Sequence, residues 1–393
     1  MKILLLIMFA AVVCANDALR DLQQGNIKFT SSLYQQIIKD SPGNVIVSPL
    51  SVQLILALTQ LGAKGDTALE LTKGLHLPDT PEKVKEAFKI LIPKLQGNQF
   101  YKLNSANKIY IKENYSINKE FQNLAQDVFD AGLENIDFVD TVSASETINK
   151  WVQGKTNDKI KKLITPDMLN AMTRLILVNA LYFNANWSSP FDTYGTSKRT
   201  FFKSEKDEIK VDTMHLTETL KYAENKDLDL KFLEIPYEGD DVSFTVVLPN
   251  QKEGLSALEG RLNEVLMPQN YSYERVNLFL PKFKIESTFK LIPALKELGI
   301  KKAFDGDQAD LSGLLSHGEP LVISDVIQKA FINVTETGTE AAAATAAILA
   351  VPYSSITYDR VILVDANRPF FFFITHKASK EILLVGRFSA GQK

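Results

Sequence analysis

The sequence predicts an α+β fold in a single large domain, and three observations support this prediction. The chain has 393 residues, 45% of them hydrophobic and 23% charged, so it can bury a substantial core. Helical and strand-like segments are mixed without regular β-α-β alternation. No linker rich in proline, glycine or serine divides the chain, and no repeat recurs. We therefore expect one continuous unit.

The first residues have the pattern of a secretory signal peptide. An apolar run over residues 3–13 follows one lysine and ends in Val13-Cys14-Ala15, with small residues where a signal peptidase cuts. We expect a signal peptide over residues 1–15, a secreted product and a mature domain over residues 16–393. Since Cys14 is the only cysteine, the mature chain would have no disulfide, and its fold must rest on a large packed core.

The N-terminal half of the mature chain mixes amphipathic or apolar helices with buried strands. Turn residues such as Ser41-Pro42-Gly43-Asn44, and prolines at helix starts, mark the boundaries. Helices are predicted over 19–40, 49–62, 81–95, 118–129 and 144–164, and strands over 44–47, 103–115 and 173–187.

From Lys198 onward the pattern becomes rich in strands. Runs of branched and aromatic residues, several of them with alternating polarity, indicate half-buried or buried sheet. Strand-rich segments are predicted over 199–204, 209–216, 230–250, 275–287, 321–334, 360–376 and 381–388, with one helix over 288–300.

The charge pattern argues against nucleic acid and membrane partners. The formal net charge is −3, from 44 basic and 47 acidic residues, so no overall field favours a polyanion. Lys83, Lys85 and Lys89 lie on one predicted helix, but Glu82 and Glu86 interleave with them, which favours a solvated face over a glycosaminoglycan site. Beyond the signal peptide no segment approaches the length of a transmembrane helix.

The sequence carries no affirmative catalytic motif. It has no HExxH motif, no Cys/His cluster and no glycine-rich phosphate loop, so no metal or cofactor is expected. The nearest approach to a G-x-S-x-G elbow, around Ser389, has the wrong spacing. A Ser/His/Asp triad assembled from distant residues stays open, because a triad is recognised by geometry. Structural roles are the simpler explanation for the four histidines, His76, His215, His317 and His376.

One stretch combines properties that conflict. Residues 338–351 are rich in alanine and favour a helix, yet they follow a predicted strand. With the period of two of a strand, Glu340 falls on one face, while the other face is small at its start and apolar at its end. The members of this second face are Thr339, Ala341, Ala343, Thr345, Ala347, Leu349 and Val351. A segment with such weak local preference suits a conformational switch, and an alanine-rich loop or short helix is the alternative.

Seven motifs in order resemble the serpin family over essentially the whole mature chain. They are NVIVSPLSVQLILALTQLGAKGDT, LVNALYFNANWSSPF, LEIPYEGDDVSFTVVLP, LFLPKFKIES, TGTEAAAATAA and ANRPFFFFI with LLVGRF. The loop and the C-terminal tail look most like secreted insect members. The resemblance implies about nine helices and three β-sheets with an exposed reactive-centre loop. It also implies a suicide inhibitor of serine proteases, whose cleaved loop enters the main sheet as a new strand while the protease is held as an acyl-enzyme.

The resemblance assigns roles to three groups of residues. The hinge and loop fall at about 336–360, and the hinge residues are Glu336, Gly338, Thr339, Glu340, Ala341, Ala342, Ala343 and Ala344. The residues that control opening of the main sheet, called the shutter and the breach in this family, are Ser48, Ser51, Asn179, Trp187 and Gln328. Gln328 replaces the histidine of many vertebrate members and removes any titration near neutral pH.

Family spacing places the residue before the scissile bond at Pro352, whose ring is a poor fit to most serine proteases. A shift by one residue makes Pro352 the P2 residue and Tyr353-Ser354 the reactive bond. A P1 tyrosine suits the hydrophobic pocket of a chymotrypsin-like protease, which would be held covalently by a monomeric inhibitor. An elastase-like protease that cuts near residues 349–351 is one alternative. A serpin-fold binding or storage protein that never inserts its loop is the other.

Four sequons for N-glycosylation are present in the chain. Asn114 and Asn270 lie in loop-like contexts and are the expected sites of modification. Asn186 and Asn333 lie beside long apolar strands and are expected to stay unmodified.

Overall fold

The computed structural model describes the backbone of residues 2–317, 320–339 and 360–389, and the side chains of these ranges from residue 17 onward. This part of the chain contains nine α-helices and three β-sheets, which confirms the predicted α+β class. The helices are α1 (Lys2–Ile37), α2 (Pro49–Gly62), α3 (Gly65–Gly74), α4 (Pro81–Leu95), α5 (Lys119–Asp127), α6 (Thr141–Lys155), α7 (Leu255–Gly260), α8 (Leu262–Val265) and α9 (Ile292–Glu297).

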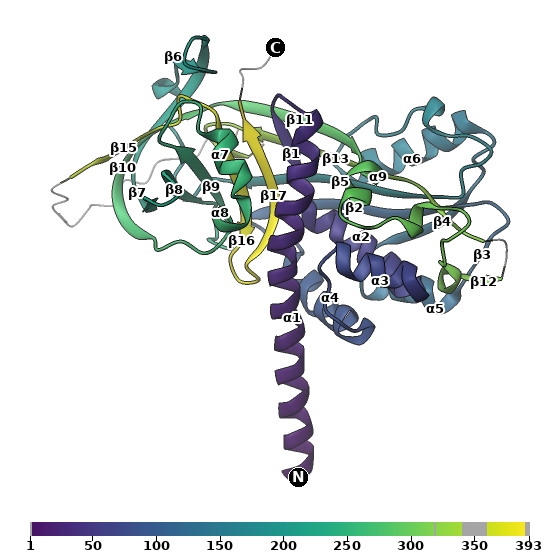
Figure 1. Ribbon diagram of the computed structural model, residues 1–393. Helices are drawn as coiled ribbons and strands as arrows, with labels where there is room; N and C mark the ends of the chain where they lie inside the picture. Colours follow the sequence, from purple (N-terminus) through teal and green to yellow (C-terminus); the bar gives the residue numbers. More distant parts are fainter. Residues whose placement is uncertain (1, 318–319, 340–359, 390–393) are drawn as a thin grey trace.

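The N-terminal part of α1 extends away from the rest of the molecule (Figure 1). It includes the predicted signal peptide, and cleavage after Ala15 stays a prediction. Among the helices of the described residues, none is both long enough and apolar enough to span a membrane.

A six-stranded sheet occupies the centre of the molecule (Figure 1). Its strands, in spatial order, are β11 (Phe283–Lys290), β13 (Ile323–Val334), β14 (Gly338–Thr339), β5 (Leu175–Asn186), β2 (Tyr101–Lys112) and β4 (Gly132–Ile136). Below the short strand β14, β13 and β5 pair directly and in parallel, from Ile323 opposite Leu175 to Phe331 opposite Tyr182. The sheet is therefore split at one end and closed along the rest of this junction.

The second sheet has nine strands and the third has two. The larger one runs through β1 (Val45–Val47), β17 (Glu381–Phe388), β16 (Phe370–His376), β9 (Val242–Pro249), β8 (Leu230–Pro236), β7 (Glu208–Asn225), β10 (Ser272–Pro281) and β15 (Ile362–Asp365), with β6 (Ser197–Phe202) also paired to β7. The third consists of β12 (Leu315–His317) and β3 (Ser116–Ile117). The strand β15 begins soon after residues 340–359, which lie outside the described ranges.

The two faces of β5 belong to different cores because its side chains alternate. Leu177, Leu181 and Phe183 join the main core with α1, α2 and α4. Val178 and Tyr182 face a smaller core that α6 covers. Figure 1 shows α2, α3 and α4 on one side of the central sheet and α6 on the other. A strand added beside β5 would thus place alternate side chains in two different environments.

Two predicted helices are shorter in the structure. The helix expected over 144–164 ends at Lys155, because Asn157 and Asp158 have positive φ angles of 48° and 61° that a helix does not accommodate. The helix expected over 288–300 is reduced to α9, because residues up to Lys290 continue β11 and pair with β13. The helix α3 and the strand β4 were not predicted.

Glu381 is a fully buried carboxyl group at the start of β17. Neither of its carboxyl oxygens has a hydrogen-bond partner among the described residues. Burial raises the pKa of Glu381 to about 8. The side chain is therefore protonated in the folded protein at neutral pH, whereas in the unfolded chain it would be ionised.

We expect Glu381 to make the folded state less stable as pH rises. The folded protein binds one more proton than the unfolded chain between the ordinary glutamate pKa and about 8, so this contribution is complete at low pH and lost on approaching pH 8. Glu381→Gln should remove this slope, which is on the order of 1 kcal/mol per pH unit. Urea unfolding of both proteins from pH 4 to pH 9 measures it. A constant difference between them at every pH would contradict the assignment.

Candidate functional site

The hinge residues Gly338 and Thr339 form the short strand β14, which is wedged between β13 and β5. Gly338 pairs with Asn186 and Thr339 with Ala185, and on the other side Thr339 pairs with Val334. A Cβ atom at position 338 would lie 2.1 Å from the carbonyl oxygen of Ala185. Only glycine therefore permits this close approach of the two backbones.

An ion pair anchors the turn that precedes the wedge. The Glu336 carboxylate lies 2.8 Å from Lys282 Nζ and accepts a hydrogen bond of 2.8 Å from the Thr196 hydroxyl. Burial alone would raise the pKa of Glu336, but hydrogen bonds from Lys282, from the backbone and from Thr196 hold this pKa below its usual value. The Phe191 amide also donates to the Glu336 carbonyl at 2.9 Å. These contacts bind the base of the hinge to loop residues that are distant in sequence.

At the split end of the six-stranded sheet, Trp187 packs together with Tyr237. The two rings are stacked with centroids 4.5 Å apart, and both are almost completely buried. The Trp187 indole donates to the Thr335 carbonyl at 2.9 Å, and the hydroxyl groups of Tyr237 and Thr339 are 2.6 Å apart. The aromatic pair therefore contacts the turn and the wedge at the same time.

Further along the junction from β14, a buried cluster of amide side chains joins β5 to β13. Gln328 Nε2 donates to Asn179 Oδ1 at 2.5 Å, and the Ser51 hydroxyl donates to the same oxygen at 2.9 Å. The Gln328 amide also forms two bonds with the backbone of Ser48, which begins the turn into α2. Asn179 Nδ2 donates to Asn107 Oδ1 on β2. Both strands of the junction are thus tied to each other and to the helix below.

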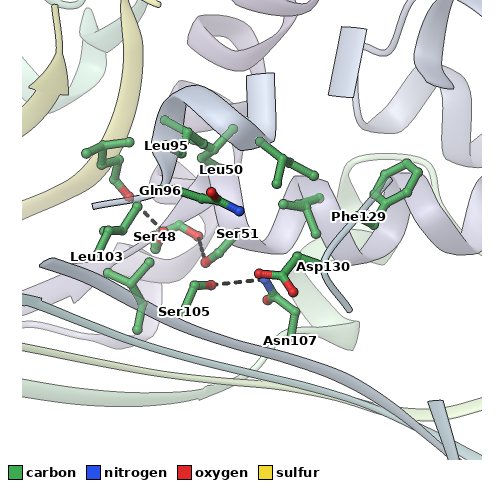
Figure 2. Close-up of a pocket in the computed structure, with 14 residues that line it drawn as sticks. Ser48, Leu50, Ser51, Leu95, Gln96, Leu103, Ser105, Asn107, Phe129 and Asp130 are labelled. Carbon is green, nitrogen blue, oxygen red and sulfur yellow. Dashed lines mark hydrogen bonds between the residues drawn. The ribbon is translucent and has the colours of Figure 1, made fainter. Parts of the chain in front are cut away.

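A cavity of about 100 Å³ lies next to this cluster, between α2, α4 and β2. Figure 2 shows Ser48 and Ser51 on one side of it and Ser105 and Asn107 on the other, with Leu50, Leu95, Leu103 and Phe129 supplying apolar walls. The pocket opens to solvent beside the exposed residues Gln96 and Asp130, so the side chains beneath the junction have room to rearrange.

The structure brings together the predicted residues that it describes, in two groups. Trp187 joins Glu336, Gly338 and Thr339 at the wedge, whereas Ser48, Ser51, Asn179 and Gln328 meet in the amide cluster. The remaining predicted site residues lie outside the described ranges: Glu340, Ala341, Ala342, Ala343, Ala344, Pro352, Tyr353 and Ser354.

The sequence interpretation missed several residues of the two groups. Asn107 lies in β2 among the polar residues Asn104, Ser105 and Lys108, so the strand itself gave no distinct signal for it. Thr196, Lys282 and Tyr237 carry no local signal, because their partners are distant in sequence.

The two expected glycosylation sites are exposed in the structure. Asn114 lies in a turn with a φ of 73°, and Asn270 lies in a loop before β10. Their modification stays a prediction.

Among the described residues, no histidine is paired accessibly with a second catalytic side chain. His376 Nδ1 and Ser379 Oγ are 2.8 Å apart, but both residues are buried in the turn between β16 and β17, where a substrate would not reach them. His215 is stacked on Phe279 with ring centroids 4.6 Å apart. Within the same ranges, no three His, Cys, Asp or Glu side chains gather as metal ligands would.

The two-residue strand β14 lies between β13 and β5, beside a junction where these strands pair directly, and this is the geometry of a sheet to which a further strand could be added. Comparison with known proteins agrees, since residues 24–390 match the family model described as serpin (serine protease inhibitor). The chain belongs to the serpin family.

Its relatives include insect proteins, as the sequence predicted. Antichymotrypsin-2 of Bombyx mori is 38% identical over 359 residues, which are 90% of this chain and 94% of that protein. Alaserpin of Manduca sexta is 38% identical over 380 residues, which are 95% and 96% of the two chains. The crystal structure of Serpin48, a highly specific serpin of the insect Tenebrio molitor, is 43% identical with a TM-score of 0.88, covering 95% of this chain and 99% of that one.

Replacing the Gln328 amide should weaken the junction between β5 and β13. Gln328→Leu leaves the buried Ser48 amide without its acceptor, which costs about 1–3 kcal/mol, whereas the Ser48 carbonyl keeps its hydrogen bonds from Ser51 and Val52. We expect a lower midpoint of urea unfolding at every pH, because an amide does not titrate. A double-mutant cycle with Asn179→Ala measures the coupling. Additive effects would show that the two amides do not act together.

Proposed function

We propose that this protein is a secreted suicide inhibitor of a chymotrypsin-like serine protease. In this mechanism the protease cleaves the loop, remains attached as an acyl-enzyme, and is carried along as the loop enters the six-stranded sheet. The observation that carries the proposal is the position of β14, because both of its residues pair with β5 and Thr339 also pairs with β13, in the register that a full inserted strand would continue.

The register assigns a position to each residue of the loop. If the loop continued this register from Thr339 as an inserted strand, residue 345 would lie opposite Asn179 on β5 and opposite Gln328 on β13. This alignment is consistent with the present pairing of Asn179 with Gln328. Insertion would separate the Asn179–Gln328 hydrogen bond and bring the Thr345 hydroxyl, which is both donor and acceptor, between the two amides.

The alignment also explains why the loop is small and apolar on alternate positions. Ala343 would lie opposite Leu181 and Ala330, which belong to the main core. Glu340 would lie opposite Asn184 and Asn333, which are only partly buried. The loop face that the sequence predicts to lie on a core would therefore lie on the main core, and the Glu340 carboxylate would be near water.

Insertion has identifiable driving forces. It replaces the parallel pairing of β5 with β13 by two antiparallel pairings, which are slightly more stable per residue, and it adds a full set of backbone hydrogen bonds. The pocket beneath the junction also leaves room for its side chains to rearrange around an added strand.

The target class rests on the predicted reactive bond Tyr353-Ser354, with Pro352 as P2. The name of the similar Antichymotrypsin-2 fits a P1 tyrosine. An elastase-like protease that cuts near residues 349–351 would be the alternative target. The apolar N-terminus and the exposed sequons Asn114 and Asn270 support a secreted glycoprotein, which we propose to be monomeric.

Incubation with chymotrypsin tests the proposed function. We expect a covalent complex on denaturing electrophoresis. The released C-terminal fragment should have the mass of a peptide that begins at Ser354, and the cleaved chain should be more resistant to heat. Catalytically inactive chymotrypsin is the control and should give no covalent band. A chain that is cleaved without complex and without gain in heat resistance would indicate a non-inhibitory binding or storage protein.

A charge on the core-facing side of the hinge should convert the inhibitor into a substrate. Ala343→Arg would place a guanidinium group in the main core, where an unpaired charge costs several kcal/mol, and insertion would become slower than deacylation. Glu340→Arg is the matched control, because the same side chain would lie on the partly exposed face. We expect cleaved chain from the first variant and covalent complex from the second, measured by electrophoresis. Undiminished complex with Ala343→Arg would contradict the alignment.

A further inference from the structure

A single basic residue lies at the C-terminal base of the loop. Between Lys329 and Arg368 the sequence contains no lysine or arginine except Arg360. Arg360 is exposed, and the residue that follows it, Val361, is 53% exposed. A trypsin-like protease selects its P1 residue through the positive charge that its pocket binds. The hinge and loop therefore offer such a protease one bond, Arg360-Val361.

The backbone around this bond is accessible. Arg360 and Val361 precede β15 and belong to none of the strands in the described part of the chain. The strand β15 is the last one in the path of the nine-stranded sheet, and among the described residues it pairs only with β10. An extended segment can add to the free side of such an edge strand, because its backbone groups are unpaired there. The bond thus lies beside a sheet edge, where a protease could bind it.

The register of β14 determines how much chain would follow an inserted strand. If the loop continued this register, residue 350 would lie opposite Ile323, the first residue of β13, and would be the last residue with a partner in the sheet. Tyr353 is three residues further along, which corresponds to about 10 Å of extended chain. Arg360 is ten residues further along, which corresponds to about 35 Å.

These two lengths predict different outcomes for an attached protease. A protease esterified to residue 353 would be pulled against the lower end of the six-stranded sheet, opposite the wedge, as the loop inserts. A protease esterified to residue 360 would be attached through a slack segment about as long as a small enzyme is wide. Insertion would then exert no force on its catalytic site, and water would hydrolyse the ester.

From this geometry we infer that Arg360-Val361 is an inactivation site at which trypsin-like proteases switch the inhibitor off. The serine of the protease attacks the Arg360 carbonyl, and its proton passes to the departing amine of Val361. Water then hydrolyses the ester, which leaves a carboxylate on Arg360 and regenerates the serine. The inference rests on the proposed function, because insertion of the severed loop would remove the predicted reactive bond Tyr353-Ser354 from its target.

Trypsin followed by chymotrypsin tests the inference. Trypsin should give no covalent band with the wild type and should release a C-terminal fragment with the mass of a peptide that begins at Val361. Chymotrypsin added afterwards should no longer form a complex. Arg360→Gln changes an exposed side chain, so it should fold as the wild type does and keep its complex with chymotrypsin after the same treatment. A stable complex of trypsin with the wild type, or a bond at Arg360 that stays uncut, would overturn the inference.

Two further variants control for charge and for position. Lys380→Gln removes an exposed basic residue in the turn between β16 and β17, and it should be inactivated by trypsin as the wild type is. Tyr353→Arg/Arg360→Gln moves the arginine to the predicted reactive bond, where the short segment should cause trypsin to be held covalently. Cleavage of this double variant without complex would show that the length of the attached segment does not decide the outcome.

Untreated wild type with chymotrypsin tests the proposed function separately. If no complex forms there, the inhibitory function fails, yet the fragment released by trypsin still shows whether Arg360-Val361 is the bond that trypsin cuts. If chymotrypsin is held covalently but trypsin leaves Arg360-Val361 intact, the inhibitory function stands and only the inactivation site is refuted.

Discussion

The parallel pairing of β5 with β13 is the constraint on which the rest of this structure depends. The two strands are adjacent over most of their length, yet at one end they are held apart by the two residues of β14. Because β5 and β13 are separated only beside β14, the sheet can open by extending this separation along the rest of the junction. The features around this junction either hold it closed or favour its opening.

The contacts that hold the junction differ along its length. Near the split they are ionic and aromatic, through the Glu336–Lys282 pair and the stacked rings of Trp187 and Tyr237. In the middle they are neutral amide hydrogen bonds between Asn179 and Gln328. On the outer side α6 and the segment after it cover β5 with a separate small core, and Lys329 on β13 donates to the Lys162 carbonyl in that segment. Opening of the β5–β13 junction therefore requires ionic, aromatic and hydrogen-bond contacts to break one after another.

Membership of a fold family does not by itself decide function, because one fold can carry several activities. In this chain the hinge has small residues at the positions that the registers on either side of β14 would turn toward the core, and this agreement supports inhibition. A loop that did not insert would need neither small residues on its core-facing positions nor a hydroxyl group at the height of the amide cluster.

Much of the fold was determined by sequence alone, because its signals are local. The long buried strands β5 and β13 and the apolar helix α2 follow from periodicity, and the ordered motifs indicate the family. The run of small residues after Gly338, with its single charge at Glu340, also identifies the segment that could become a strand. Local signals failed where a competing interaction was stronger, as in the residues up to Lys290, which prefer pairing in β11 to a longer helix.

Only the tertiary structure decided how the site is assembled. β14 has two residues and no sequence pattern of its own, since it exists because both neighbouring strands pair with it. The partners of Glu336, namely Lys282 and Thr196, are 54 and 140 residues away in the chain, and Gln328 is 149 residues from Asn179. Such contacts depend on how distant segments meet in three dimensions, and a pattern within any one segment does not contain that information.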